Sequence, residues 1–246
     1  PVNIRRHLST AAVKVGQALN IKNNDSWYKA MLEDQGKYQT ERNKNIRSKT
    51  EEKLMLKGGI KDIKKASTEL KKRIKYILKE PPSKAGLYKY QMYLVLKLFA
   101  ELPVRNDFAN IQVEGKTGNF LVIPKKGNIK IIFTDFKNSD RLGPREISLS
   151  RAATMALRKF LRYRKEVVSH KFLLSTKSGE RLTKSALGKA IHASMKQLVG
   201  KALGSRIFRV MHATEHKDVL EKAKSISDKM LHSQKQTQSY IRKDKE

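Results

Sequence analysis

The periodicity of apolar residues changes from helical to β in the middle of the chain and then returns to helical, and this pattern restricts the fold more than any other feature. Helical spacing prevails on both sides of residues 119–149. Within them, β-rich runs occur at Asn119–Ile123, at Ile129–Phe136 after the turn-like Pro124–Asn128, and at Arg145–Leu149. Three strands in sequence order predict a small antiparallel sheet. We therefore expect an α+β fold dominated by helices.

The helical patterns that surround this sheet predict one domain, residues 58–246. Lys57-Gly58-Gly59 is the strongest boundary signal. The most apolar segment, residues 87–102, is expected to form a buried helix that Pro103 stops, and Thr183 is expected to cap a later helix. The predicted helices are Ile60–Leu78, Leu87–Leu102, Ser150–Glu166, a segment after Thr183, Phe208–Leu220 and Ser225–Leu231.

Residues 1–57 predict a separate helical region. Apolar residues recur there at three- to four-residue steps and give one apolar face, and Asn24-Asp25-Ser26 is a helix-start signal. The chain begins with Pro1 rather than Met, so we expect a fragment or a processed product. The residues of the apolar face are Leu8, Ala12, Val15, Ala18 and Leu19.

The net charge predicts a polyanionic partner. Lysine and arginine outnumber aspartate and glutamate 54 to 23, which gives a formal net charge of +31. Phosphates favour such a surface because neutralising them releases condensed counterions. No apolar run is long enough to span a membrane, no signal peptide opens the chain and no phosphate-loop glycine pattern is present, so we expect neither a membrane nor a nucleotide partner. The absence of cysteine fits an intracellular protein.

The acidic residues and histidines do not favour a metal site. Two-metal nucleases need clustered carboxylates, whereas the spacing of Asp107, Asp135 and Asp140 does not group them. His212 and His216 are four residues apart, as zinc ligands can be, but the general-base glutamate of that motif is not in place. We expect one of the two histidines to face the core and the other to face solvent.

Cleaving DNA without a metal needs a nucleophile, cations around the phosphate and a proton donor for the leaving 5′ oxygen. A tyrosine can be the nucleophile if positive charge counters its usual pKa of about 10. Arginine suits the phosphate because its planar fork donates two parallel hydrogen bonds. The end of the chain offers such a tyrosine, Tyr240, which His232 precedes by eight residues in polar sequence.

This tail resembles the last motif of the tyrosine recombinases, the phage-type integrases. The resemblance rests on Met230-Leu231-His232-Ser233 followed by Thr237-Gln238-Ser239-Tyr240. Phe208–Thr214 resembles the second arginine motif of the family, and its Arg209 lies 23 residues before His232, a spacing typical of the family.

Two earlier segments complete the resemblance. Leu102–Phe108 resembles the first arginine motif, with Arg105 between a buried helix and the sheet. Lys137 lies at the end of the second predicted strand, where the family keeps its hairpin lysine, although three other lysines lie nearby as alternatives. The resemblance makes residues 58–246 the catalytic domain and 1–57 the end of a helical core-binding domain that clamps DNA. The alternative lysines are Lys125, Lys126 and Lys130.

One position departs from the family pattern. Three residues before the second arginine the family usually has histidine or lysine, and here that residue is Arg206. Arginine keeps the charge and the hydrogen-bond donors but cannot shuttle a proton, so we interpret Arg206 as a phosphate contact. Only residues 241–246 follow Tyr240, which leaves little chain for the helix that many relatives dock on a neighbouring protomer.

The resemblance implies site-specific cleavage and rejoining of double-stranded DNA through a 3′-phosphotyrosine, without a metal or cofactor. Tyr240 would attack, Lys137 would protonate the leaving oxygen, and the remaining site residues would hold the other phosphate oxygens. It also implies a homotetramer on recombining sites, and the lysine-rich composition points to a virus or mobile element acting in the host nucleus or cytoplasm, or in the virion. The phosphate-holding residues are Arg105, Arg206, Arg209 and His232.

Two other functions stay open. A type IB topoisomerase shares these residues and the first chemical step, and it would relax supercoiled plasmid without sequence preference. A non-catalytic basic DNA-binding protein would have the charge without the chemistry. In each case we expect affinity for DNA to fall on the order of a thousandfold between about 50 and about 200 mM salt, if six or more phosphates are neutralised.

Overall fold

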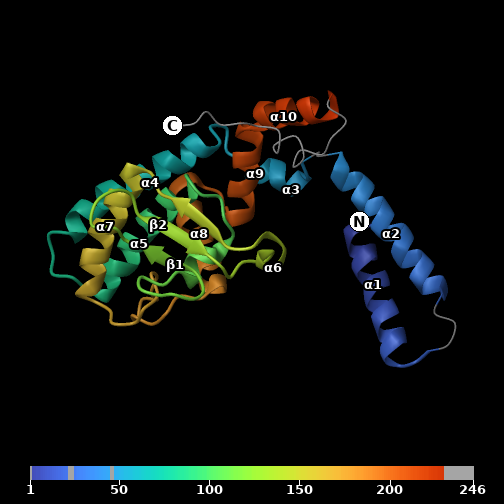
Figure 1. Ribbon diagram of the computed structural model, residues 1–246, viewed down its shortest axis with the longest axis horizontal. Helices are drawn as coiled ribbons and strands as arrows, with labels where there is room; N and C mark the ends of the chain where they lie inside the picture. The colour runs from blue at the N-terminus through green and yellow to red at the C-terminus, as the bar shows by residue number, and fades with distance from the viewer. Residues whose placement is uncertain (1, 22–24, 45–46, 230–246) are drawn as a thin grey trace, which may run out of the picture. The chain divides into compact units, whose positions relative to one another are not determined.

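The chain forms two compact units, Pro1–Lys53 and Leu54–Glu246. The computed structural model describes residues 2–21, 25–44 and 47–229 (Figure 1). The division lies just before the predicted boundary at Lys57-Gly58-Gly59. A short helix, α3 (Lys49–Leu54), spans the division. No described helix is both long and apolar enough to cross a membrane.

The first unit is a pair of packed helices, α1 (Val2–Ala18) and α2 (Asp25–Asn43). An ion pair joins them: the Nε of Arg5 donates to the Oδ1 of Asp34 at 2.6 Å, and Asp34 is buried. The predicted apolar face does not become a core here. Val13 is the buried apolar side chain of the described part of this unit, while most of the predicted face is exposed, including Leu8, Val15 and Leu19.

The second unit is built around helix α5 (Lys84–Phe99). Ser83 caps its start by accepting a hydrogen bond from the amide of Gly86 at 3.1 Å. The prediction of a buried helix is confirmed, since apolar side chains all round α5 are shielded from water, although the helix ends three residues before Leu102. The preceding helix, α4 (Ile60–Ile77), packs along α5; it starts where predicted and ends one residue before the predicted Leu78.

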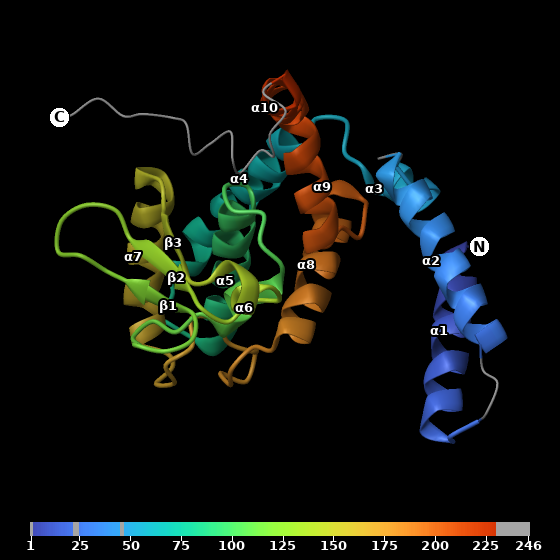
Figure 2. The ribbon, with the colours of Figure 1, turned by 45° about the vertical axis from the view of Figure 1, so that its right-hand side comes forward.

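Two further capped helices cover α5. Helix α7 (Arg151–Lys165) begins after Ser150 and helix α8 (Lys184–Val199) after Thr183, and each cap hydroxyl accepts a backbone amide at 3.2 Å. Both helices contact α5. Figure 2 shows α5 between α7 on one side and α8 with α9 on the other. This central position explains why α5 has no solvent-facing stripe.

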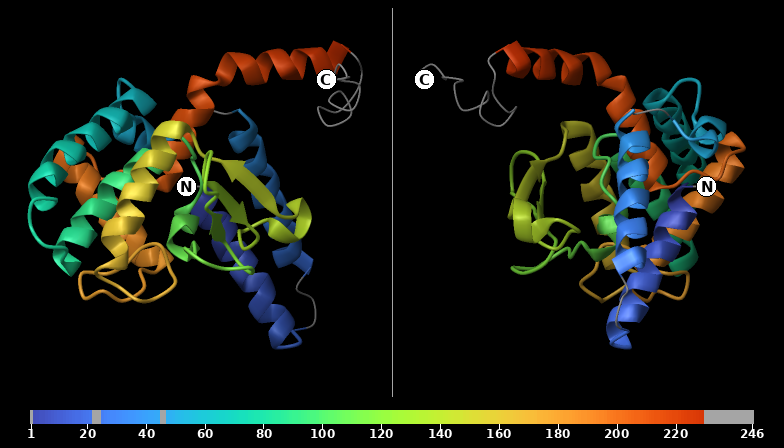
Figure 3. Two further views of the ribbon diagram at one scale, coloured as in Figure 1. Left: turned by 60° about the vertical axis from the view of Figure 1, so that its left-hand side comes forward. Right: turned by 90° about the vertical axis from the view of Figure 1, so that its right-hand side faces the viewer.

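The predicted sheet is confirmed as an antiparallel meander in the order β1-β2-β3. The strands are β1 (Phe120–Val122), β2 (Lys130–Phe133) and β3 (Arg145–Ser148). Figure 3 shows the sheet beside α7, and a hydrogen bond from the amide of Ile129 to the Oγ1 of Thr154 joins the two at 3.1 Å. The fold is therefore α+β and dominated by helices, as predicted.

Other predicted boundaries are wrong as well. Strand β2 stops at Phe133, not at Phe136. The amides of the next two residues, Thr134 and Asp135, donate to the side chain of Asn119 instead of to a neighbouring strand. Helix α9 (Ser205–Glu215) stops at His216, where the backbone leaves the helical region (φ −103°, ψ 19°), and α10 (Lys217–Lys229) follows. No glycine or proline marks that break in the sequence. Two short helices were not predicted, η1 (Asn106–Asn110) and α6 (Ser139–Leu142).

Candidate functional site

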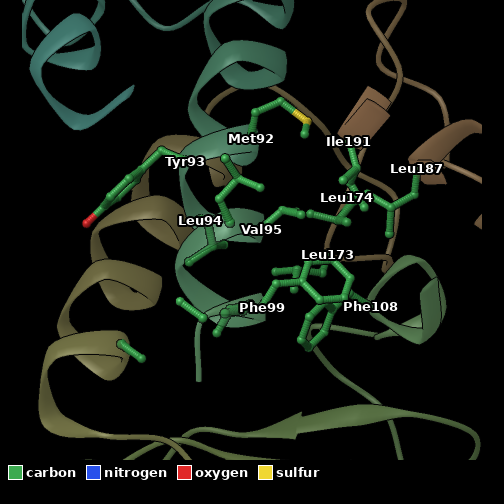
Figure 4. Packing of buried hydrophobic residues seen from close by; sticks show 14 of the residues in the cluster. Met92, Tyr93, Leu94, Val95, Phe99, Phe108, Leu173, Leu174, Leu187 and Ile191 are labelled. Atoms are coloured by element: carbon green, nitrogen blue, oxygen red, sulfur yellow. The ribbon is translucent and has the colours of Figure 1, made fainter. Parts of the chain in front are cut away.

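Three aromatic rings fix the positions of the two predicted arginine motifs. Phe99, at the end of α5, packs against Phe108 of η1 with ring centroids 4.8 Å apart (Figure 4). It also packs against Phe208 of α9 at 5.2 Å. All three rings are fully buried. Arg105 precedes Phe108 by one turn and Arg209 follows Phe208 directly, so the core brings the two arginines to the same end of α5.

Arg209 is held in a positively charged environment. Its Nε donates to the carbonyl oxygen of Ser205 at 3.3 Å, one helical turn earlier. Burial lowers the pKa of Arg209, the charges of Arg105 and Arg206 lower it further, and Asp107 opposes them. An arginine remains charged under such conditions. The charges of Arg105 and Arg206 beside it therefore make this a place where an additional negative charge is electrostatically favoured.

Lys137 reaches the same place from the sheet. It lies in the connection between β2 and β3, and it lines a pocket with Arg105 and Arg209. The alternative lysines are elsewhere: Lys130 pairs with Glu146 at 2.6 Å at the start of β2. Lys125 and Lys126 lie in the turn between β1 and β2, at the opposite end of the hairpin.

The pocket has a volume of about 440 Å³, which is within the range of small-ligand sites. Its walls come from the first arginine motif, the connection after β2, and the starts of helices α8 and α9. Four of its side chains are cationic and two are anionic. The lining residues are Arg105, Asn106, Asp107, Asp135, Phe136, Lys137, Lys184, Ser205 and Arg209.

Two of these residues form an ion pair that sequence reasoning missed. The Nζ of Lys184, at the start of α8, lies 2.9 Å from the Oδ1 of Asp107, whose side chain is 8% exposed. The neighbouring Asn106 donates from Nδ2 to the carbonyl oxygen of Lys184 at 3.0 Å. These contacts tie η1 to α8. The position of Lys184 directly after the cap Thr183 was visible in the sequence, but nothing there indicated its partner.

The structure describes one further predicted residue, which is not part of the pocket. Arg206 is exposed and does not line it, although its charge acts on Arg209. His232 and Tyr240 lie outside the described residues and stay predictions. The structure therefore assembles three of the six predicted site residues, Arg105, Lys137 and Arg209, and adds the Asp107–Lys184 pair.

The carboxylates and histidines of the described residues do not form a metal-binding group of three. Asp107 and Asp135 line the pocket, whereas Asp140 lies in α6 and is exposed. The Nε2 of His212 lies 3.3 Å from the carbonyl oxygen of Phe99, and burial lowers the pKa of this histidine. His216 is exposed. One histidine thus faces the core and the other faces solvent, as predicted.

This arrangement suits a ligand with several anionic oxygens. Two guanidinium groups and two ammonium groups surround one cavity, and arginine and lysine are the side chains that proteins use for phosphate. The two carboxylates, Asp107 and Asp135, reduce the repulsion among the cations when no ligand is bound. The site can hold a phosphate and place an ammonium group beside one of its oxygens.

Comparison with known proteins gives a distant likeness in fold. The crystal structure of XerA recombinase is similar to this chain with a TM-score of 0.44 and 15% sequence identity. The match covers 78% of this chain and 58% of that one, so the chain spans somewhat more than half the length of that protein. No family model and no curated protein matches the chain.

Proposed function

We propose that this chain cleaves and rejoins duplex DNA through a covalent bond between Tyr240 and a DNA 3′ phosphate. The pocket that gathers Arg105, Lys137 and Arg209 is the observation that carries the proposal. These residues lie far apart in the sequence and were predicted as one set before their positions were known. A basic chain offers many arginines and lysines, and the three that the resemblance selects line one cavity of about 440 Å³.

The proposed reaction balances without a metal. The phenol oxygen of Tyr240 bonds to phosphorus and releases its proton to water, while the bond between phosphorus and the 5′ oxygen breaks. Lys137 gives a proton to that oxygen, so a 5′ hydroxyl leaves. Arg105 and Arg209 hold the non-bridging oxygens, on which negative charge grows in the transition state.

Rejoining is the same reaction in reverse. A 5′ hydroxyl, from the same or from a second duplex, attacks the phosphotyrosine and returns its proton to Lys137. The phosphotyrosine retains the energy of the broken diester, so ATP is not needed. Attack by a second duplex gives recombination, and attack by the original strand gives relaxation.

Covalent capture tests the proposal without knowledge of the target site. The full chain is incubated in EDTA with a pool of duplexes that carry a randomised stretch and a nick. The short strand between cleavage site and nick dissociates, so rejoining is blocked and the adduct accumulates. We expect DNA-linked protein that survives denaturation, and none with Tyr240→Phe. An adduct of undiminished yield with Tyr240→Phe, or no adduct from any sequence in the pool, would overturn the proposal.

The selected sequences then separate recombination from relaxation. A recombinase should enrich a defined sequence and join two marked duplexes that contain it. Relaxation of plasmid without sequence preference, with the same Tyr240 adduct, would assign the chemistry to a type IB topoisomerase instead. Binding that depends on salt but gives no adduct would leave the chain as a basic DNA-binding protein.

A further inference from the structure

We propose that Asn119 is the positioning residue of Lys137, because it holds the chain that leaves β2 and thereby sets where the lysine enters the pocket. This inference rests on the proposed function, in which Lys137 donates the proton. Asn119 precedes β1, is 1% exposed and does not line the pocket. It is a buried polar side chain that is not among the predicted catalytic residues.

The side chain of Asn119 makes three hydrogen bonds to two consecutive residues. Its Oδ1 accepts the amide of Thr134 at 2.9 Å and the amide of Asp135 at 2.8 Å. Its Nδ2 donates to the carbonyl oxygen of Asp135 at 2.9 Å. An amide side chain offers one oxygen with two acceptor positions and, on a separate atom, an NH₂ donor. These bonds end β2 at Phe133 and direct the chain out of the sheet.

The residues that follow are fixed as well, which leaves Lys137 little freedom at its backbone. Phe136 packs against the hydrophobic core and lines the pocket. The amide of Ser139 donates to the carbonyl oxygen of Phe136 at 2.9 Å as α6 begins. Lys137 is therefore anchored by Asn119 on one side and by this turn on the other.

A second brace acts on the side chain of Asp135. Its Oδ2 accepts a hydrogen bond from the Nδ2 of Asn110 at 3.1 Å, and Arg181 donates to the Oδ1 of Asn110 at 3.0 Å. The guanidinium of Arg181 lies 3.9 Å from the ring centroid of Phe172. Main chain and side chain of Asp135 are thus both held, two residues before Lys137.

A substrate with sulfur in place of the bridging 5′ oxygen shows whether Asn119 acts through Lys137. A thiol has a pKa of about 8.5, whereas that of water is about 15.7 and an alcohol is comparable, so a thiolate leaves without a proton donor. Loss of the proton donor slows cleavage of the oxygen substrate and spares the sulfur substrate. Loss of phosphate binding or of the fold slows both.

Gln91 provides a matched control. It is a buried amide on α5 that makes the same kind of clamp, donating to the carbonyl oxygen of Ser175 at 2.6 Å and accepting its amide at 2.9 Å. It does not line the pocket. Gln91→Ala therefore removes a comparable buried clamp at a place unrelated to Lys137.

We expect Asn119→Ala to slow adduct formation on the oxygen substrate on the order of a hundredfold, since small misplacements of a catalytic group cost about that much. On the sulfur substrate the rate should stay near that of the unmodified chain. Lys137→Ala should give the same pattern, and Gln91→Ala should affect both substrates equally. Equal loss on both substrates with Asn119→Ala, or no loss on either, would overturn the inference.

A measurement without DNA keeps the inference separate from the proposed function. Hydrogen exchange at the amides of Thr134 and Asp135 should be slow in the unmodified chain and fast in Asn119→Ala, while Gln91→Ala should release the amide of Ser175 instead. If the alanine variant does not fold, Asn119→Asp is measured in its place. This variant keeps the side-chain oxygen that accepts both hydrogen bonds, so the amides of Thr134 and Asp135 should stay protected from exchange. Fast exchange at both amides in the unmodified chain would disprove the clamp even if no substrate is cleaved.

Discussion

The two ends of the sheet both carry lysines, but they differ in how firmly the backbone around these lysines is held and in what lies beside them. At the pocket end, Lys137 follows a segment that a buried amide and a half-buried ring hold in place. At the other end, Lys125 and Lys126 lie exposed in a turn that Arg158 joins to α7 through the carbonyl oxygen of Pro124, at 2.5 Å. Both ends are basic, and Lys137 at the first end lines a cavity together with Arg105 and Arg209. In a chain with 54 basic residues, the fixed position of a cation indicates a site better than its presence.

We expect the largest difference between the two ends of the sheet when their lysine side chains are removed. Lys137→Ala should slow adduct formation by about 10² to 10⁴, the usual contribution of a positioned proton donor. The rate constant of single-turnover cleavage in the capture assay is the measurement. The double change Lys125→Ala and Lys126→Ala is the control, and a similar loss there would show that the sheet ends do not differ in chemistry.

The geometry of the pocket cations should matter nearly as much as their charge. Arg209→Lys keeps the charge but loses the planar fork that can bind two phosphate oxygens. We expect adduct formation to fall by about 10² to 10³, as for removal of one transition-state donor. Activity that survives Arg209→Lys but not Arg209→Ala would show that a point charge suffices there.

Removing the contact that holds the turn between β1 and β2 should lower the stability of the fold and leave the cleavage rate unchanged. Arg158→Ala removes the hydrogen bond to Pro124 and should destabilise the fold by about 1–2 kcal/mol. Urea unfolding of the variant measures this change. The cleavage rate at saturating DNA should stay as it was, in contrast to Asn119→Ala. A selective loss on the oxygen substrate would show that both ends of the sheet control Lys137.

The far-end lysines should contribute to binding alone. If Lys125 and Lys126 each neutralise a DNA phosphate, replacing both by alanine should reduce the slope of log affinity against log salt by about 1.8. Titrations of labelled duplex at several salt concentrations give this slope. An unchanged slope would place the turn away from the DNA.

We expect the smallest effect from pH, which changes the stability of the fold through His212, a residue of the helix that carries Arg209. The pKa of His212 is lowered below 6.5 in the fold, mainly by burial. The unfolded chain then binds the proton more readily, so stability is complete above pH 6.5 and falls as pH drops through the lowered value. Unfolding at about pH 8 and about pH 5 measures the loss, and His212→Gln should reduce it. Burial also lowers the pKa of His170, so some pH dependence should remain.

The sequence determined the elements whose burial follows from local pattern. The apolar segment around Leu94 could only be an internal helix, and the runs near Ile131 could only pair as neighbouring strands. The cap at Thr183 was correctly predicted because it is local, whereas Ser150, predicted as the first residue of its helix, is the cap that precedes it. The break at His216 was not predicted, since no helix-breaking residue marks it and the core contacts of α9 simply end after Met211.

The candidate site, too, could be predicted only in part from local sequence. Arg105, Lys137 and Arg209 could be selected from the resemblance of their motifs and from their order. Arg105 and Lys137 each follow a predicted element, and Arg209 lies at the start of a predicted helix. Their meeting in one pocket depends on the packing of Phe99 against Phe108 and Phe208, which are distant in sequence.

Tertiary structure alone decided the roles of the polar residues around them. Asp107 gains its partner Lys184, and Asn119 its hold on Thr134 and Asp135, through contacts that no spacing rule predicts. A hydrogen bond forms where packing brings a donor within about 3 Å of a suitably oriented acceptor. The sequence therefore named the groups for the proposed chemistry, and the fold determined which neighbours hold the described ones in place.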